Sequence, residues 1–310
     1  SIVVKVVRPG ISRVIAEDFD IARRWVRRLS RVRALRRLSL EALLEEFAAS
    51  LASELDLRIE GRVADRFQHD FRDDELVFVP CVIWRHSTRR VLTMEFVEGW
   101  RLTDIPEAER QGVDAFGLAV HGAEVFMKQV LVFGRYHADL HPANLFVTPD
   151  GRICYLDFGI TGRTAPSQRV AIAQVLAATV YGDAERAVRY SRELGLDIPD
   201  HLEGVIRARV AELLERTMGG AGPSDVRGFA MGFLSLLADF KIPIPQGYGL
   251  LVKALVTVEG VARRLYPQID IAEAAKPFAT RLIAREMSRP ARLAARMPDA
   301  LRAALRELAS

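Results

Sequence analysis

Residues 136–163 constrain the fold of this chain more than any other stretch of its sequence. They include three side chains with oxygen ligands, Asp139, Asn144 and Asp157. Between Asn144 and Asp157 two short apolar runs flank a Pro-Asp-Gly turn, a pattern typical of a β-hairpin. A hairpin brings the start of its first strand close to the end of its second, so Asn144 and Asp157 should converge, with Asp139 just upstream. Such hard oxygen ligands suit Mg²⁺ that carries a phosphate.

The spacing of these residues is also that of protein-kinase-like enzymes, in which His-x-Asp-x-x-x-x-Asn precedes Asp-Phe-Gly. His137, Asp139 and Asn144 fit the first motif, and residues 157–159 fit the second. The complete set, with a hairpin between its halves, is much more specific than a His-Asp pair alone. We therefore predict an α+β fold of the two-lobed, protein-kinase-like type.

The predicted N-lobe is small and β-rich and covers residues 1–97, and the predicted C-lobe is large, mostly helical and covers residues 98–310. The N-lobe should contain a lysine-bearing strand, a basic helix, a glutamate-bearing helix and two further strands, at residues 2–7, 12–38, 40–68, 76–84 and 90–97. The C-lobe should begin with a long helix and continue, after the hairpin, with a series of helices near residues 107–134, 167–181, 184–194, 200–217, 225–238, 247–266, 271–287 and 299–309.

Composition fits an ordinary globular protein, because 50% of the 310 residues are hydrophobic, 27% are charged and the net charge is +4. The two cysteines, Cys81 and Cys154, lie in apolar runs and predict neither a disulfide framework nor a metal site. A cytosol-facing location is therefore expected. No apolar run reaches the roughly 18 residues that span a bilayer. Because the sequence opens on Ser1 without a starting methionine, we expect it to be part of a longer protein.

Lys5 lies in a β-branched run that ends at Arg8-Pro9-Gly10. In a kinase-like fold the lysine of such a strand contacts the phosphates of ATP; a solvent-facing lysine on an edge strand is the alternative. Glu60, in the helix predicted at residues 40–68, is our choice for the partner of Lys5. Asp56 should share its helix face one turn earlier, and ordinary solvated carboxylates are the alternative for both acids.

A connector between the lobes follows the strand predicted at residues 90–97. It could offer backbone groups of Glu95 and Val97 to a flat heteroaromatic ring, a role that depends little on the identity of either side chain.

The helix predicted at residues 12–38 carries a dense arginine run between Arg23 and Arg37, beside an apolar stripe. Such a basic amphipathic helix can lie on an anionic membrane surface, and a solvated helix face fits equally well. Nucleic acid is not expected as a partner, because no aromatic platform or binding module accompanies the arginines.

Only a few residues separate Gly159 from the helix that follows Pro166. Protein kinases hold a peptide on a long segment at this point, usually closed by Ala-Pro-Glu. A peptide substrate is therefore not expected.

With these residues in hand, the chain resembles the UbiB/ADCK family of atypical kinase-like proteins. The resemblance is carried by Arg8-Pro9-Gly10, by Glu54-x-Asp56 with Glu60, by the His-Pro pair within residues 137–144, and by residues 255–260. It implies an ATP- and Mg²⁺-dependent kinase-like protein that is associated with membranes and linked to ubiquinone biosynthesis or lipid metabolism.

Some features of that family are altered in these 310 residues or lie outside them. In the family Glu54 and Asp56 would form a Glu-x-Asp motif that faces a Lys-x-Gly-Gln motif, which the sequence does not include. The alanine-rich loop that covers the nucleotide should precede Lys5 and is likewise not included. Leu140 and Ala143 replace the proline and glycine that are common in the family, and neither position supplies a ligand atom.

The leading hypothesis is Mg²⁺-dependent ATP hydrolysis or phosphoryl transfer to a small or lipid-like acceptor. Asn144 and Asp157 would hold the metal, Lys5 steadied by Glu60 would contact the phosphates, and Asp139 would orient the attacking hydroxyl or water. A peripheral position on the cytoplasmic side of a membrane follows from the same hypothesis.

Two alternatives remain open from the sequence. One is a small-molecule kinase of the aminoglycoside or choline type, which shares His-x-Asp-x-x-x-x-Asn. The other is a non-catalytic, nucleotide-gated scaffold that binds lipid or partner enzymes.

Overall fold

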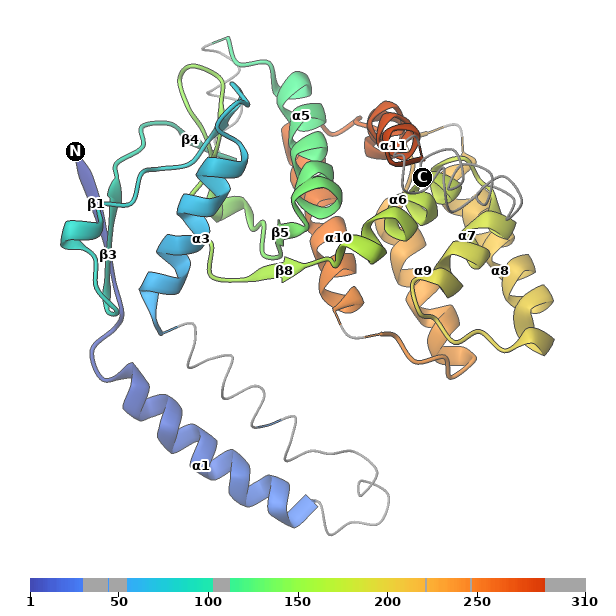
Figure 1. The fold of residues 1–310 in the computed structure, drawn as a ribbon, viewed down its shortest axis with the longest axis horizontal. Coiled ribbons are helices and arrows are strands. Elements are labelled where there is room, and N and C mark those ends of the chain that lie inside the picture. Colours follow the sequence, from blue (N-terminus) through green and yellow to red (C-terminus); the bar gives the residue numbers. More distant parts are fainter. Residues whose placement is uncertain (30–43, 45–54, 103–111, 221, 246, 288–310) are drawn as a thin grey trace, which may run out of the picture. The chain divides into compact units, whose positions relative to one another are not determined.

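The computed structural model describes residues 1–29, 44, 55–102, 112–220, 222–245 and 247–287, and the chain forms two compact units (Figure 1). Unit 1 consists of residues 1–101 and 143–159, and unit 2 of residues 102–142 and 160–310. The sequence-based division counted the hairpin with the C-terminal lobe, whereas the compact units group it with the N-terminal segment.

Unit 1 contains two small sheets. In the first, β1 (Ile2–Val6) runs antiparallel to β3 (Val91–Glu95). The second has the strand order β2-β7-β6-β4, with β2 at Val77–Phe78 and β4 at Trp100–Arg101. The predicted hairpin forms the centre of this second sheet, where β6 (Leu145–Val147) pairs antiparallel with β7 (Ile153–Tyr155). Its turn is closed by the N–H of Thr148, which donates to the carbonyl of Arg152.

The strand predicted at residues 76–84 is shorter than expected. Only Val77–Phe78 pairs in a named strand, parallel to β7, and Trp84–His86 forms a 3₁₀ turn. Pro80 explains the early end, because proline has no N–H to donate to a sheet ladder. The strand predicted at residues 90–97 forms as β3 with trimmed ends.

Two helices of unit 1 are described, α1 (Ile11–Leu29) and α3 (Leu57–Asp70). The helix predicted at residues 40–68 is not continuous at Asp56, since Leu55 and Asp56 are non-helical and α3 begins at Leu57. The reason is local: the Asp56 side chain accepts from the N–H of Arg58 and so caps the new helix. Residues 30–38 of the helix predicted at 12–38, and residues 40–43 and 45–54 of the helix predicted at 40–68, lie outside the described residues.

Unit 2 contains a short sheet and a succession of helices. The sheet pairs β5 (Arg135–His137) antiparallel with β8 (Thr161–Arg163). The described helices are α5 (Ala115–Lys128), α6 (Pro166–Val180), α7 (Ala184–Glu193), α8 (Asp200–Met218), α9 (Val226–Asp239), α10 (Tyr248–Leu265) and α11 (Ile271–Met287). The predictions for α6 to α11 agree with these bounds within two residues, and the segment predicted at residues 299–309 lies outside the described residues.

The long helix predicted at residues 107–134 is interrupted near its start, and its first part, residues 107–111, lies outside the described residues. Residues 112–114 are non-helical, and α5 starts at Ala115, where the Asp114 side chain caps it by accepting from the N–H of Gly117. A π-helical turn, Gln129–Phe133, continues α5. The sequence-based expectation that no apolar run is long enough to span a bilayer is corrected here, because the combined segment of residues 115–133 is long and apolar enough to do so. Half of this segment is buried inside the protein, as is typical of a core helix.

The π-helical turn ends at Gly134, whose φ of 68° is left-handed. Arg169 of α6 packs directly against this glycine, and its guanidinium donates to the carbonyl of Val132 at 2.7 Å. A side chain at position 134 would therefore be strained in its backbone and would collide with Arg169. Directly after this turn the chain enters β5, which ends at His137, the first residue of the His-x-Asp motif.

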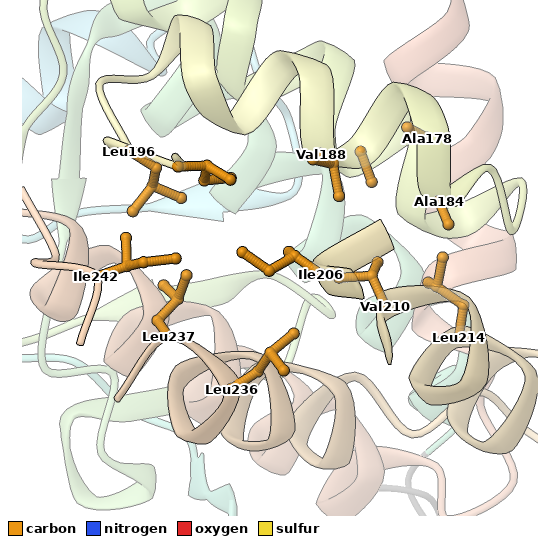
Figure 2. Close-up of a cluster of buried hydrophobic side chains, with 12 residues drawn as sticks. Ala178, Ala184, Val188, Leu196, Ile206, Val210, Leu214, Leu236, Leu237 and Ile242 are labelled. Carbon is orange, nitrogen blue, oxygen red and sulfur yellow. The ribbon is translucent and has the colours of Figure 1, made fainter. Parts of the chain in front are cut away.

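The helical core of unit 2 lies where α6 to α9 pack together, with small and branched side chains pointing toward one another (Figure 2). Ile206 of α8 is fully buried in this cluster, and Val188 of α7 and Leu237 of α9 are 2% exposed. Burial of aliphatic side chains from four helices in this cluster stabilises this part of the chain.

An apolar cavity of about 200 Å³ also lies within unit 2. It is lined by side chains of several helices, among them Phe126, Ile172, Phe229, Phe233 and Leu251. Lys276 and Tyr181 also contribute to its lining, and the Lys276 ammonium lies 5.5 Å from the centre of the Tyr181 ring.

We expect Ile206→Ala to lower the free energy of unfolding by about 2–5 kcal/mol, because it removes buried methyl groups and leaves a void. The neighbouring Val205 is 49% exposed, and Val205→Ala should cost less than about 0.5 kcal/mol. Urea denaturation of both variants measures the difference. Equal losses in the two variants would contradict the assignment of Ile206 to the core.

Candidate functional site

Lys5 is presented by β1, where its Cα pairs with that of Leu92 in β3. The strand is β-branched at four of its five positions, which favours the extended conformation. Lys5 is partly buried, whereas its neighbours on β1 are exposed, so β1 directs the lysine toward the interior of unit 1.

Glu60 is presented by the first turn of α3 and is 6% exposed. The helix is anchored to the hairpin segment by aromatic contacts, since the Phe67 ring lies 5.3 Å from that of Tyr155 and 5.2 Å from that of Phe158. Because Phe67 lies two turns after Glu60 on α3, this packing also fixes Glu60 relative to the Asp-Phe-Gly motif.

These elements bring three charged groups of unit 1 into contact. The Lys5 ammonium donates to both carboxylate oxygens of Glu60, at 2.7 and 2.9 Å, and to Oδ2 of Asp157 at 3.1 Å. The other oxygen of Asp157 accepts from the N–H of Gly159 at 2.9 Å. Lys5, Glu60 and Asp157, which we call the Lys5 cluster, therefore join residues far apart in the sequence.

Two members of the Lys5 cluster, Lys5 and Glu60, have raised pKa values. Burial alone would lower the pKa of Lys5, but the hydrogen bonds and charges of Glu60 and Asp157 outweigh it, and the pKa of Lys5 is raised. Burial raises the pKa of Glu60 despite its hydrogen bond to Lys5. Both directions agree with the composition of the cluster, in which two carboxylates share one ammonium.

Asn144 lies directly before β6, and Asp157 lies two residues after β7 ends. The N–H of Leu156 donates to the carbonyl of Asn144 at 3.0 Å, which extends the hairpin ladder by one bond and holds the two ends together. The predicted convergence of the hairpin ends is thus present in the backbone.

Asp139 belongs to unit 2 and is placed by the loop after β5. The N–H of Asp139 donates to Nδ1 of His137 at 3.1 Å, and His137 is 1% exposed. One carboxylate oxygen of Asp139 accepts from the ammonium of Lys253, on α10, at 3.0 Å.

The remaining predicted residues are placed as follows. Asp56 does not share a helix face with Glu60, because it is the N-cap of α3, and its carboxylate binds the guanidinium of Arg58 at 2.7 and 2.9 Å. Glu95 ends β3, and its N–H donates to the carbonyl of Cys81 at 3.0 Å, so only other backbone groups there could meet a ligand. Val97 is partly buried, and Glu54 lies outside the described residues.

Sequence reasoning missed Lys253 and Gln129. Gln129 is fully buried in the π-helical turn, and its side-chain oxygen accepts from the N–H of His137 at 2.9 Å. The available signal for Lys253 was a single cation within the apolar sequence Leu-Leu-Val-Lys-Ala-Leu-Val. Gln129 offered no comparable signal, because no known sequence motif predicts the π-helical turn that places its side chain near His137.

Comparison with known families accounts for this combination of elements. Residues 1–191 match the ABC1 atypical kinase-like domain, and residues 229–270 match the UbiB helical domain. The chain belongs to the ABC1 atypical kinase-like family. The Lys5 cluster and Asp139 lie in the kinase-like part, whereas Lys253 lies in the helical part.

Curated relatives cover most of the chain. The protein slr1919 of Synechocystis sp. is 32% identical over 90% of this chain, and a protein named probable protein kinase UbiB from Marinobacter nauticus is 30% identical over 89%. The chloroplastic protein Activity of BC1 complex kinase 3 of Arabidopsis thaliana is 30% identical over 91%. The chain spans 50%, 52% and 40% of these relatives' own lengths, respectively.

Among solved structures, that of Rv3197 from Mycobacterium tuberculosis, determined with erythromycin, matches with a TM-score of 0.59 and 18% identity. The match covers 89% of this chain and 70% of that one. Together with the family match, this likeness confirms the predicted α+β, kinase-like fold class.

The pKa of Asp56 is lowered to about 2, chiefly by the side-chain hydrogen bond from Arg58. Because the pKa in the folded chain lies below the ordinary value of 3.8, the ionised carboxylate stabilises the fold above about pH 4, and this contribution disappears as the pH falls through about 2. Asp56→Asn keeps a capping oxygen and removes the charge. We expect it to lower the free energy of unfolding by up to about 1 kcal/mol at pH 7, with the difference vanishing near pH 2.

Urea unfolding at a series of pH values between 2 and 7 measures this difference. Asp73→Asn is the control, because the Asp73 side chain is 90% exposed, and it should change the free energy of unfolding by less than about 0.5 kcal/mol throughout. A loss in Asp56→Asn that is the same at every pH would show that the Asp56 charge has no role.

Proposed function

We propose that this chain binds ATP with Mg²⁺ and catalyses hydrolysis of the γ-phosphate or its transfer to a small or lipid-like acceptor. The observation that carries the proposal is the Lys5 cluster, in which one ammonium is held by a glutamate from α3 and by the aspartate of Asp-Phe-Gly. Membership of an atypical kinase-like family supports it.

The donor chemistry of the hairpin ends fits Mg²⁺. Asn144 and Asp157 offer an amide oxygen and a carboxylate, and Mg²⁺ commonly takes one or two such protein ligands and completes its octahedron with phosphate oxygens and water. The Lys5 cluster has two carboxylates against one ammonium, so additional positive charge near Asp157 would be electrostatically favourable. A bound metal ion would supply neutralisation of phosphate charge.

Each residue of the site then has a defined task. Lys5, kept in place by Glu60, would donate to phosphate oxygens, and Asn144 and Asp157 would hold the metal. Asp139 accepts the hydrogen bond of the attacking hydroxyl or water and orients it. In phosphoryl transfer the protein contributes mainly such positioning and charge stabilisation.

A lipid-like acceptor is supported by the apolar cavity of about 200 Å³ in unit 2. An engineered apolar cavity of about 150 Å³ in another protein holds benzene, so this volume suits an aromatic ring or a short stretch of hydrocarbon chain. A peptide acceptor is disfavoured, because α6 begins at Pro166, only seven residues after Gly159. A place in ubiquinone or other lipid metabolism is consistent with the relatives named UbiB.

The first test measures Mg-ATP binding by calorimetry and phosphate release or transfer in the full chain. We expect Asp157→Asn to weaken ATP binding in the presence of Mg²⁺ at least tenfold, and Asp139→Asn to leave binding intact while turnover falls about 10²- to 10⁴-fold. Asp150→Asn is the matched control, because Asp150 lies in the turn of the same hairpin and pairs with Arg152. Normal Mg-ATP binding by Asp157→Asn would refute the metal assignment.

The acceptor class is resolved in the same assay by three arms: water alone, amino alcohols, and a prenylated phenol in vesicles. Stimulation of ATP consumption by the prenylated phenol supports the proposal. Rapid consumption with amino alcohols would favour the aminoglycoside or choline type of kinase. Tight ATP binding without turnover in any arm would favour the nucleotide-gated scaffold.

We also propose that α1 contacts an anionic membrane surface. Three apolar side chains at helical spacing, Val14, Ile21 and Trp25, are between 48% and 58% exposed, and Arg13 and Arg24 are exposed on the same helix. Exposed apolar groups beside arginines are typical of helices that lie in the headgroup region. The arginines between residues 30 and 37 lie outside the described residues.

We expect Ile21→Glu to reduce co-sedimentation with vesicles that contain an anionic lipid at least severalfold, since it removes apolar contact and adds a repelled charge. Ile21→Ser separates the two effects. The matched control is Val205→Glu, an equally exposed apolar position on α8. Unchanged sedimentation of Ile21→Glu would refute the assignment of α1 to the membrane surface.

A further inference from the structure

Lys253 connects the helical part of the chain to the His-x-Asp loop. Its ammonium donates to Oδ1 of Asp139 at 3.0 Å, and the two side chains are 51% and 40% exposed. Both residues belong to unit 2. Residues 137–144 contain neither lysine nor arginine, so within this loop no side chain of fixed positive charge accompanies Asp139.

At the Asp139 end of this contact, the backbone is fixed by hydrogen bonds. Nδ1 of His137 accepts from the N–H of Asp139, and the side-chain oxygen of Gln129 accepts from the N–H of His137. The N–H of Ala138 donates to the carbonyl of Ile160 at 3.0 Å. The backbone on which Asp139 lies is therefore held without help from Lys253.

The Lys253 end is fixed independently, because α10 is anchored on both sides of the lysine. At its start, the Tyr248 hydroxyl accepts from the Gln168 amide of α6 at 3.1 Å. Toward its end, Glu259 is 3% exposed and binds the Arg263 guanidinium and the N–H of Arg227 at the start of α9. These anchors determine which way the face of α10 that carries Lys253 is turned.

The pair is therefore placed by two rigid supports. Exposed ion pairs add little to stability, so stability alone gives no reason for the placement. Binding of one oxygen of a carboxylate does, however, set the direction of the other, and misplacement of a reacting group by about 1 Å can cost about a hundredfold in rate.

We propose that Lys253 is a positioning residue for the phosphoryl-transfer reaction, acting through Asp139. The inference rests on the proposed function. The acceptor oxygen forms a bond to the γ-phosphorus of ATP as the bond to the bridging oxygen breaks, ADP leaves with that electron pair, and the acceptor's proton passes to Asp139. Lys253 keeps its own protons throughout and holds the Asp139 carboxylate aligned with the acceptor. The UbiB helical domain thereby completes the catalytic loop of the kinase-like domain.

The test compares Lys253→Met and Lys253→Arg with wild type in the full chain. We expect Lys253→Met to lower kcat about 10- to 100-fold, to leave the Kd for Mg-ATP within about twofold, and to leave the urea midpoint unchanged. Lys253→Arg should recover part of kcat. The control, Arg209→Met, removes an exposed cation that pairs with Glu212 on α8, and it should leave kcat unchanged.

A second measurement isolates the route of action. In an Asp139→Asn background, Lys253→Met should produce no further loss of kcat, because residues that act as a unit are not additive. An equal loss in both backgrounds would show a structural effect and overturn the inference. An unchanged kcat in Lys253→Met would overturn it too, and an increased kcat would identify the contact as a block on Asp139. If wild type turns over no ATP in any acceptor arm, the proposed function itself fails, and the role of Lys253 fails with it.

Discussion

One ammonium group shared between two carboxylates organises unit 1. Lys5 reaches Glu60 and Asp157 only if β1, α3 and the end of the hairpin keep their relative positions. The aromatic contacts of Phe67 and the capping of α3 by Asp56 serve the same end, since they fix the helix that carries Glu60. With both carboxylates ionised, the cluster carries a net negative charge, because two negative groups face one positive group. A cationic ligand would bring that balance closer to neutrality.

The elements that sequence reasoning recovered are those with a strong local pattern. The hairpin follows from alternating apolar runs around a Pro-Asp-Gly turn, and α6 to α11 follow from helical periodicity between glycine and proline breaks. The pairing of Lys5 with Glu60 could be anticipated because in a kinase-like fold the helix after the lysine strand supplies a glutamate that pairs with the lysine. The structure places the two side chains in contact, and their role in phosphate binding stays a prediction.

The features that sequence reasoning did not predict depend on local side-chain and backbone effects or on tertiary packing. At Asp56 the apolar stripe continues past the residue, but a side-chain oxygen that accepts from the N–H of Arg58 makes Leu57 the first residue of α3. At Pro80 the apolar run continues, although the missing N–H prevents a longer ladder. Lys253 could not be assigned to Asp139, because 114 residues separate them and only the packing of α10 brings them together.

The hairpin has a further consequence for how the protein can be divided. The chain enters unit 1 a second time at Ala143 and leaves it at Gly159, so unit 1 is discontinuous in sequence. A fragment of residues 1–101 would lack β6 and β7, the two central strands of its four-stranded sheet, together with Asn144 and Asp157. Its β2 and β4 would then have no partners in that sheet. A self-sufficient form of unit 1 therefore requires the hairpin to be supplied in the same polypeptide, for example by joining residue 101 to residue 143 through a short linker.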